Sequence, residues 1–285
     1  MSELSSWAPA AVAHVERTAR GGPLDPTLRV TFNFHPDRLH RGTPVLQAMA
    51  VDGTYRSQFE TGTSNGGLTA HPGGSRWLWE QRLFGGAYDD APHSERPRYG
   101  ALNHRRRPVG GAPRFGSAHL RLAPHTLQRT TFCYPDSVFE PEHLGTATSF
   151  DLVRRADDDL ASGVVDVLDS YVEAHLHGVV DLATDVEALV LDPAFRGSDV
   201  EHAAEALPFA VEWHRGFRVD LDTVGRHPDY RGPHIVALAQ EVAVDGWLDP
   251  AVVGAAAATR AHDPQDLKKV WHHLARFGAP DLHHP

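Results

Sequence analysis

Acidic and histidine side chains concentrate in one stretch of the sequence, residues 171–195. In its first part, YVEAHLHG, Glu173, His175 and His177 occupy alternate positions. Because successive side chains of a strand point to opposite faces of a sheet, a strand here would present all three on one face. With one more ligand from elsewhere in the chain, that face could hold zinc or another divalent ion and leave a position open to water. A polar sheet face that binds nothing is the alternative interpretation.

Glu187 lies in the second part of the stretch, before the apolar run ALVL at residues 188–191. Asp192-Pro193 ends that run, because proline cannot donate to a strand ladder. The pattern therefore predicts a carboxylate at the mouth of a strand, where a rigid backbone can hold a catalytic acid or base. A solvated surface glutamate is the alternative.

A glycine-rich loop, TGTSNGG at residues 61–67, is the third candidate site. Glycine lets backbone N–H groups approach a ligand closely, and Ser64 and Asn65 could hydrogen-bond the hydroxyl groups of a sugar. An exposed turn without a ligand is the alternative.

The elements that must position these groups are strands in antiparallel-looking clusters with helices between them. Hydrophobic spacing predicts strands at residues 28–35, 99–103, 115–122, 130–134, 171–177, 187–191 and 211–214. The same spacing, together with capping residues, predicts helices at 7–20, 45–53, 75–84, about 139–169, from 198, from 249 and at 263–277. This mixture is typical of an α+β protein.

This order of elements predicts that the chain has three parts. We expect an N-terminal helix within residues 1–24, an α+β core at 25–245, and a helical C-terminal extension at 246–285 packed on the core.

Composition and charge exclude several classes of protein. No apolar run among the 285 residues approaches the roughly 20 residues of a membrane helix, and we expect no secretory signal. The single cysteine, Cys133, rules out an intramolecular disulfide and fits a reducing cytoplasm. The net charge of -10 argues against bulk nucleic-acid binding. The sequence therefore predicts a cytoplasmic protein without a membrane segment.

Two further features have ordinary explanations. The basic run RRR at residues 105–107 is typical of a solvated loop, with a phosphate contact as the alternative. Trp77, Trp79 and Phe84 could serve a non-catalytic binding module, but their spacing with Leu83 favours packing in the core.

Eight short segments together resemble a bacterial family known only as domain of unknown function 3626. They are FHPD, YRSQFETGTSNGGLTAHPGG, FGGAYDDAP, RPRYGALN, PRFGSAHLRL, TTFCYPDS, YVEAHLHG and DVEALVLDP, spread from about Val30 to about Asp249. The resemblance implies no activity, because the family label carries none.

The order of the parts also resembles, more loosely, the ADP-ribosyltransferase superfamily. That resemblance implies a split, antiparallel-rich sheet whose first strand bears a histidine or arginine, here His35, Arg29 or Arg41. A short helix then ends in glycine, as residues 45–53 do, and a serine segment and a late glutamate follow, here Ser64 and Glu187.

The superfamily resemblance also implies a reaction, in which NAD is the co-substrate. Glu187 would stabilise the positive charge that develops on the ribose as nicotinamide leaves, with His35 and Ser64 beside it. The implied cofactor-binding residues are Arg29, Arg41, Gly42, Thr63, Asn65 and Gly66. The acceptor stays open between a protein, a nucleic acid, a small molecule and water, with a protein or a small molecule as the expected partner. The alternatives are a metal-dependent hydrolase built on the Glu173/His175/His177 face, and a non-catalytic binding module.

Overall fold

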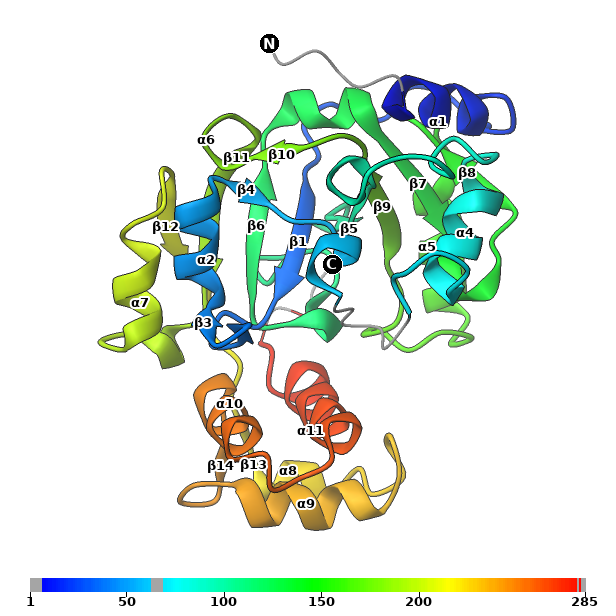
Figure 1. Cartoon of the computed structure of the whole chain (residues 1–285). Helices are drawn as coiled ribbons and strands as arrows, with labels where there is room; N and C mark the ends of the chain where they lie inside the picture. Colours follow the sequence, from blue (N-terminus) through cyan, green and yellow to red (C-terminus); the bar gives the residue numbers. More distant parts are fainter. Residues whose placement is uncertain (1–6, 63–68, 281, 283–285) are drawn as a thin grey trace.

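The computed structural model describes residues 7–62, 69–280 and 282, and a mixed sheet of eight strands forms the centre of this part (Figure 1). The strand order is β12-β11-β6-β1-β5-β9-β7-β8. Its strands are β1 (Val30–Phe34), β5 (Arg98–Leu102), β6 (Ala118–Leu122), β7 (Thr130–Tyr134), β8 (His143–Gly145), β9 (Val172–Leu176), β11 (Val186–Leu191) and β12 (Ala210–Trp213). The pair β11/β12 is parallel and the other pairs are antiparallel. The predicted α+β class is confirmed.

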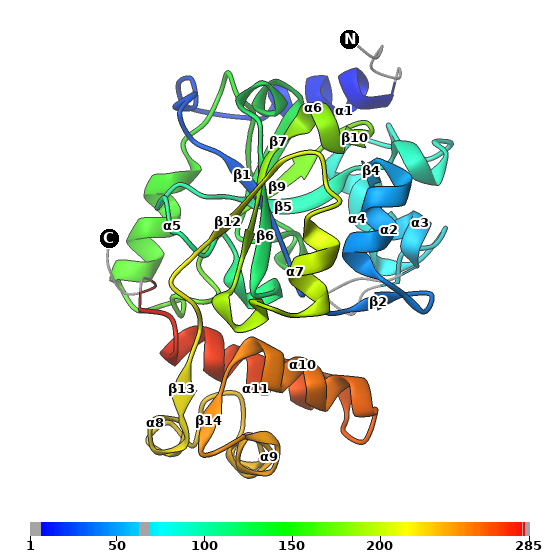
Figure 2. The same cartoon turned by 90° about the vertical axis from the view of Figure 1, so that its left-hand side faces the viewer.

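Helices and short ribbons surround the sheet. The helices are α1 (Trp7–Glu16), α2 (Val45–Asp52), α3 (Gln58–Thr61), α4 (Ser75–Leu83), α5 (Leu152–Ala161), α6 (Leu182–Asp185), α7 (Asp199–Ala204), α8 (Leu221–Gly225), α9 (His234–Val242), α10 (Pro250–Thr259) and α11 (Pro264–Phe277). The two-stranded ribbons pair β2 (Leu39–His40) with β3 (Thr43–Pro44), β4 (Thr54–Tyr55) with β10 (Val180–Asp181), and β13 (Val219–Asp220) with β14 (Trp247–Leu248). Short 3-10 turns cover His93–Glu95, Pro113–Phe115, Pro124–Arg129, Ser137–Phe139 and Pro193–Phe195. In Figure 2 the sheet is nearly edge-on, with α5 on one side and α2, α3 and α4 on the other.

The main hydrophobic core follows from the period of two in the strands. Alternate residues of β1, β6 and β9 are apolar and pack with α2, α5 and α7. The members of this core include Val30, Phe32, Leu46, Met49, Leu120, Leu122, Leu152, Ala156, Val172, Ala174, Leu176 and Ala204. The intervening residues of the same strands are polar and remain available for a site.

The sheet opens between β1 and β5. These strands pair at only two positions, Val30 with Leu102 and Thr31 with Ala101. By contrast, β1 pairs with β6 at four positions and β5 with β9 at five. Beyond Thr31 the two central strands therefore separate, and each continues with its outer neighbour alone.

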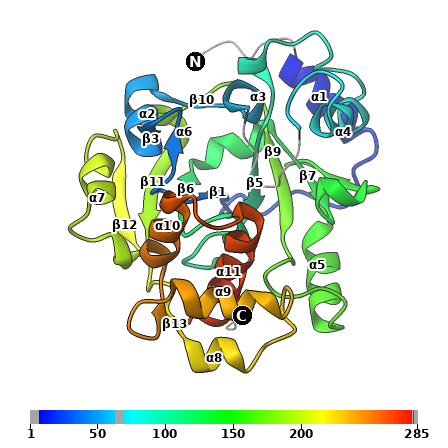
Figure 3. The same cartoon turned by 60° about the horizontal axis from the view of Figure 1, so that its bottom comes forward.

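A second hydrophobic core lies in the C-terminal region, which is below the sheet in Figure 1 and comes forward in Figure 3. It contains residues of β13, β14 and helices α8 to α11, from Phe217 onward, with Trp271 and Leu274 among the fully buried members. The predicted boundary at residue 246 therefore falls inside this core, because the strand at 219–220 pairs with the strand at 247–248.

The long helix predicted at about 139–169 is shorter in the structure, where α5 covers only Leu152–Ala161. Strand β8 replaces its first part. Between the two elements, the hydroxyl group of Thr146 accepts hydrogen bonds from the backbone amides of Thr148 and Ser149. Such local bonds compete with helix formation. Gly163, at φ +73°, lies just beyond the C-terminal end of α5.

No helix in the described ranges has both the length and the apolar character required to span a bilayer.

Candidate functional site

His35, directly after β1, and Arg41, in the turn between β2 and β3, line the same cavity. The His35 ring packs edge-on against Trp271, with the ring centroids 4.8 Å apart. Loss of solvent around the ring, reinforced by the charge of Arg38, lowers the pKa of His35 to about 3, so the ring is neutral. Arg41 and Gly42 have φ values of 51° and 86° and join β2 to β3. A two-residue hairpin turn favours such positive values, which gives Gly42 a structural reason to be glycine.

Glu187 lies toward the opposite end of β1, in an irregularity of β11 between Val186 and Ala188. Its carboxylate forms ion pairs with Arg29 Nε at 3.0 Å and Arg121 Nε at 3.1 Å. Arg29 and His35 are six positions apart along an extended chain, which at about 3.3 Å per residue is roughly 20 Å. The structure brings Glu187 to Arg29 but not to His35. The expected joint site of His35 and Glu187 does not form, because β1 separates them by its own length.

Thr63, Ser64, Asn65 and Gly66 lie outside the described residues.

Two adjoining cavities occupy the place where β1 and β5 separate. We call them the cleft cavity, which Glu173 and residues of β1, β5 and α4 line, and the outer cavity, which His35, Arg41 and residues of α2 line. Tyr55, Gln58 and Tyr99 line both. The two cavities are therefore neighbours across shared walls.

Glu173 is the buried carboxylate of the cleft cavity, with 8% of the residue exposed. Ser137 Oγ donates a 2.5 Å hydrogen bond to its Oε1 atom, and His175 Nε2 lies 2.8 Å from the same oxygen. Burial alone would raise the pKa of Glu173. The hydrogen bond and charge of His175, with smaller contributions from Ser137 and Arg76, hold that pKa below its usual value. Glu173 is therefore ionised at neutral pH.

Asp136, a second carboxyl group on the cleft wall, shifts in the opposite direction. Burial and the nearby charge of Glu173 raise the pKa of Asp136, although the hydroxyl group of Tyr171 donates a hydrogen bond to it. The two carboxyl groups of this cavity therefore differ in acidity, because the pKa of Glu173 is lowered and that of Asp136 is raised. Such a difference lets one group stay charged while the other takes up and releases a proton.

Cations and aromatic rings complete the cleft cavity. Its cationic lining residues are Arg76, Arg114 and Lys268, and its aromatic ones are Tyr55, Trp79, Tyr99, Phe115 and Tyr171. The Arg76 guanidinium lies 4.0 Å from the centroid of the Tyr99 ring. Arg114 Nη1 forms a 2.8 Å ion pair with Asp169. Lys268 comes from α11, so the C-terminal core contributes to the wall of the cleft.

Behind Glu173 a chain of hydrogen bonds runs through the protein interior. His175 Nδ1 lies 3.2 Å from Thr131 Oγ1, which lies 2.9 Å from His177 Nε2. His177 Nδ1 in turn lies 2.8 Å from the hydroxyl oxygen of Tyr88. With its proton on Nε2, His177 accepts a hydrogen bond from Tyr88 and donates one to Thr131 Oγ1, which also contacts His175 Nδ1. Burial lowers the pKa of His177 well below its usual value, so this ring is neutral.

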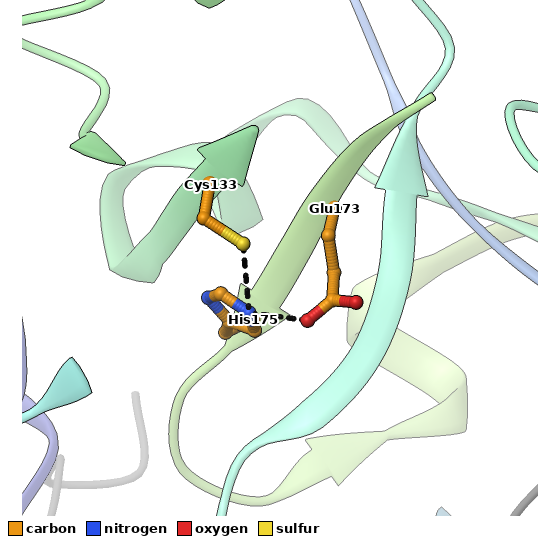
Figure 4. Close-up of side chains that lie close together, drawn as sticks. All are labelled: Cys133, Glu173 and His175. Atoms are coloured by element: carbon orange, nitrogen blue, oxygen red, sulfur yellow. Dashed lines mark hydrogen bonds and ion pairs between the residues drawn. The ribbon is translucent and has the colours of Figure 1, made fainter. Parts of the chain in front are cut away.

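The predicted metal-binding face is only partly assembled. Glu173 and His175 lie side by side on β9, and the third group beside them is Cys133 of β7 rather than His177 (Figure 4). One ligand atom from each of the three lies within 4.8 Å of the others. Thiolate, imidazole and carboxylate are a zinc-type donor set. However, burial and the charge of Glu173 raise the pKa of the Cys133 thiol well above its usual value, so the thiol is protonated.

Sequence patterns alone missed several groups of the cleft. Arg76, Tyr99, Asp136, Ser137 and Tyr171 were not among the predicted site residues, although they line the cavity beside Glu173. The signal that could have found Asp136 and Ser137 is their position directly after the strand at 130–134, where polar residues end an apolar run.

Comparison with known protein families and with curated proteins gives one match. A family model described as "Protein of unknown function (DUF3626)" matches residues 29–158 and 157–277. Comparison with curated proteins finds no match. The matched residues include both sides of the opened sheet, the walls of the cleft and α11, and the chain therefore belongs to the DUF3626 family of proteins of unknown function.

Proposed function

We propose that this protein cleaves the nicotinamide–ribose bond of NAD and transfers the ADP-ribosyl group to an acceptor, in the cleft between β1 and β5. The observation that carries the proposal is Glu173, an ionised and buried carboxylate that lines a cavity together with cations and aromatic rings. The superfamily resemblance makes Glu187 the carboxylate that stabilises the charged ribose. We assign this role to Glu173 instead, because Glu187 lies away from the cleft and forms ion pairs with two arginines.

The pair of cavities supports a dinucleotide as the ligand. A dinucleotide has two flat ring systems joined by a charged diphosphate, so it needs two adjoining spaces and cations near their junction. Arg76, Arg114 and Lys268 line the cleft cavity, and Arg38 and Arg41 line the outer cavity. Aromatic walls of the cleft suit the nicotinamide ring, since aromatic groups prefer offset or edge contacts with one another.

The chemistry follows from the two carboxyl groups. The bond between ribose C1′ and the pyridinium nitrogen breaks, and its electron pair leaves with nicotinamide as a neutral molecule. Positive charge then develops on the ribose, and the ionised Glu173 stabilises it. A lone pair of the acceptor forms the new bond to C1′. The acceptor proton passes to Asp136, whose raised pKa makes it the better base near neutral pH, and then to solvent.

The experiment that tests this proposal compares two isosteric substitutions. Glu173→Gln removes the charge in the cleft, whereas Glu187→Gln makes the same chemical change outside it. We expect Glu173→Gln to lower the rate of nicotinamide release from NAD by about 10²-fold or more, the scale for loss of one preorganised charge-stabilising group. Glu187→Gln should retain most of the rate. No nicotinamide release by the unaltered protein, or equal rates in the unaltered protein and Glu173→Gln, would overturn the proposal.

A metal-dependent hydrolase is the second candidate, favoured by the Cys133/Glu173/His175 cluster. Those three side chains would hold the ion, which would supply an activated water. Metal analysis of purified protein separates the two candidates, because about one zinc per chain together with no nicotinamide release would favour the hydrolase.

A further inference from the structure

A third cavity lies where β6 and β11 meet the loop of residues 103–117. We call it the arginine cavity, because Arg29, Arg106, Arg107 and Arg121 line it. His119 of β6 and Glu212 of β12 also contribute to its wall. The triple-arginine run, which the sequence predicts to be a solvated loop, thus contributes two of its members to a cavity wall.

Three of the four arginines have carboxylate partners. Arg29 and Arg121 share Glu187, and Arg121 also binds Glu212 through two nitrogens at 2.8 and 2.6 Å. Arg106 pairs with Asp25 at 3.2 Å. These bonds orient the guanidinium groups of Arg29, Arg106 and Arg121.

Arg107 differs from the other three. Only 5% of the residue is exposed, and within the described residues its side chain has neither an ion pair nor a hydrogen bond. Burial and the charge of Arg105 lower the pKa of Arg107 to about 10 against the opposing charge of Asp157, which still leaves Arg107 charged at neutral pH. A buried charge that no carboxylate contacts directly is costly, and the more distant charge of Asp157 offsets only part of that cost.

His119 provides a second buried polar group without a full set of partners. The residue is 3% exposed, and in the described part of the chain its Nδ1 atom has no hydrogen bond. It lies on β6 in register with Asn33, two positions before Arg121. A ring nitrogen and several guanidinium groups therefore line the same space.

We propose that the arginine cavity binds a phosphate group, carried by a small phosphate ester or present as inorganic phosphate. Arg107 is the guanidinium group of the wall whose N–H donors have no bond among the described residues, and such paired donors match two phosphate oxygens better than a halide. The four arginines and the carboxylates of Asp25, Glu187 and Glu212 together leave one positive charge on the wall, that of Arg107, which a phosphate monoanion would neutralise.

The arginine cavity is separate from the cleft cavity of the proposed function. The loop of residues 103–117 crosses β1 between them, where Asn33 Nδ2 donates to the Val109 carbonyl at 2.9 Å and the Gly111 amide donates to Thr31 Oγ1 at 2.8 Å. Phosphate binding is thus an inference independent of NAD cleavage.

Equilibrium binding of radiolabelled inorganic phosphate and of a nucleoside 5′-monophosphate to the full chain tests the site. Both are measured at constant ionic strength with chloride as the background anion. We expect saturable binding of about one phosphate group per chain. Tighter binding of the ester identifies an ester as the natural source, and equal binding identifies inorganic phosphate. No saturable binding of either probe would overturn the proposal.

Three variants locate the site. Arg107→Met should weaken phosphate binding by about tenfold or more, since a charge-assisted hydrogen-bond donor is lost. Arg226→Met, at an exposed arginine of the C-terminal core, should bind as the unaltered protein does. Lys268→Met removes a cation of the cleft cavity and should also leave phosphate binding unchanged. Loss of binding in Lys268→Met but not in Arg107→Met would place phosphate in the cleft and refute the inference.

A measurement on the unaltered protein covers the case in which Arg107→Met does not fold. Hydrogen exchange at the backbone amides of residues 103–117 should slow on addition of phosphate and not on addition of chloride. Unchanged exchange there, with slower exchange around Lys268, would also refute the inference.

Discussion

His175 Nε2 lies 2.8 Å from Glu173 Oε1, two positions along the same strand, and the two side chains point to one face of β9. The contact orients the carboxylate and lowers its pKa, so that a buried glutamate stays charged. The partner of His175 on its other side is Thr131, which links it to His177 and Tyr88. This chain of side chains therefore supports the carboxylate of Glu173 from behind.

Thr131→Val tests whether this hydrogen-bond chain positions Glu173. Valine keeps the shape of threonine but cannot bridge the two histidine rings. We expect kcat for nicotinamide release to fall about tenfold with little change in KM for NAD, since a misplaced catalytic group lowers the rate more than the affinity. The acid limb of the pH–rate profile should move to higher pH, because His175 would hold the pKa of Glu173 down less firmly.

Thr130→Val is the matched control. Thr130 is equally buried and donates its hydroxyl hydrogen bond to the Thr126 carbonyl, outside the chain that leads to Glu173. Its kcat and pH profile should stay close to those of the unaltered protein. Identical profiles for both valine variants would argue against a positioning role for Thr131.

Buried neutral histidines predict a loss of stability in mild acid. Burial, together with nearby cations, lowers the pKa of His272 from about 6.5 to about 2, and neither ring nitrogen has a hydrogen bond among the described residues. Below pH 6.5 the unfolded chain therefore binds a proton at this residue that the folded chain does not. The contribution is fully present above pH 6.5 and is lost as the pH falls toward 2, at up to about 1.4 kcal/mol per pH unit.

His272→Leu should remove this contribution. We expect the free energy of unfolding of the variant to rise relative to the unaltered protein by roughly 2–3 kcal/mol between pH 6.5 and pH 4.5, measured by urea denaturation. His202→Leu, at an exposed histidine, should show no such divergence. The variant must be compared with the unaltered protein at each pH, because two other groups also change the free energy of unfolding with pH. Burial raises the pKa values of Glu80 and Asp192 to about 7 and about 6, and their contributions have the opposite sign to that of His272. Parallel curves for His272→Leu and the unaltered protein would contradict the prediction.

Trp271 connects the C-terminal core to the edge of the cleft. The side chain is fully buried, its Nε1 atom donates to the carbonyl oxygens of Pro113 and Arg114, both at 3.1 Å, and its ring contacts His35. Trp271→Ala should lower the free energy of unfolding by about 3–5 kcal/mol, through lost packing and the resulting cavity. Trp271→Phe should cost clearly less. A loss below about 1 kcal/mol in the alanine variant, measured by denaturation, would show that the two cores are not coupled through this residue.

Metal removal distinguishes the two interpretations of Glu173. If Glu173 acts on NAD as a carboxylate, nicotinamide release should be unchanged after dialysis against EDTA, and Cys133→Ser should retain the rate. Zinc analysis of the same samples provides the measurement for the alternative. Loss of nicotinamide release on chelation, with recovery on addition of zinc, would assign Glu173 and His175 to a metal.

The sequence by itself determined the alternation of strands and helices and the face shared by Glu173 and His175. Both depend on local periodicity, because a period of two fixes side-chain direction along any strand. It could not determine the extent of α5, since the segment before the helix is held by partners elsewhere in the sequence: β8 pairs with β7, and the hydroxyl groups of Thr148 and Ser149 donate to Glu16.

Only the tertiary structure decided which carboxylate enters the cleft and what surrounds it. Glu173 and Glu187 have similar sequence contexts, yet strand order places the first against Ser137 and the second against Arg29 and Arg121. Strand order depends on pairing between segments far apart in the chain, such as β1 with β5 and β6. Local propensity does not encode such long-range pairing, and for that reason the partners of Glu173, like the burial of Arg107, emerge only once the sheet has formed.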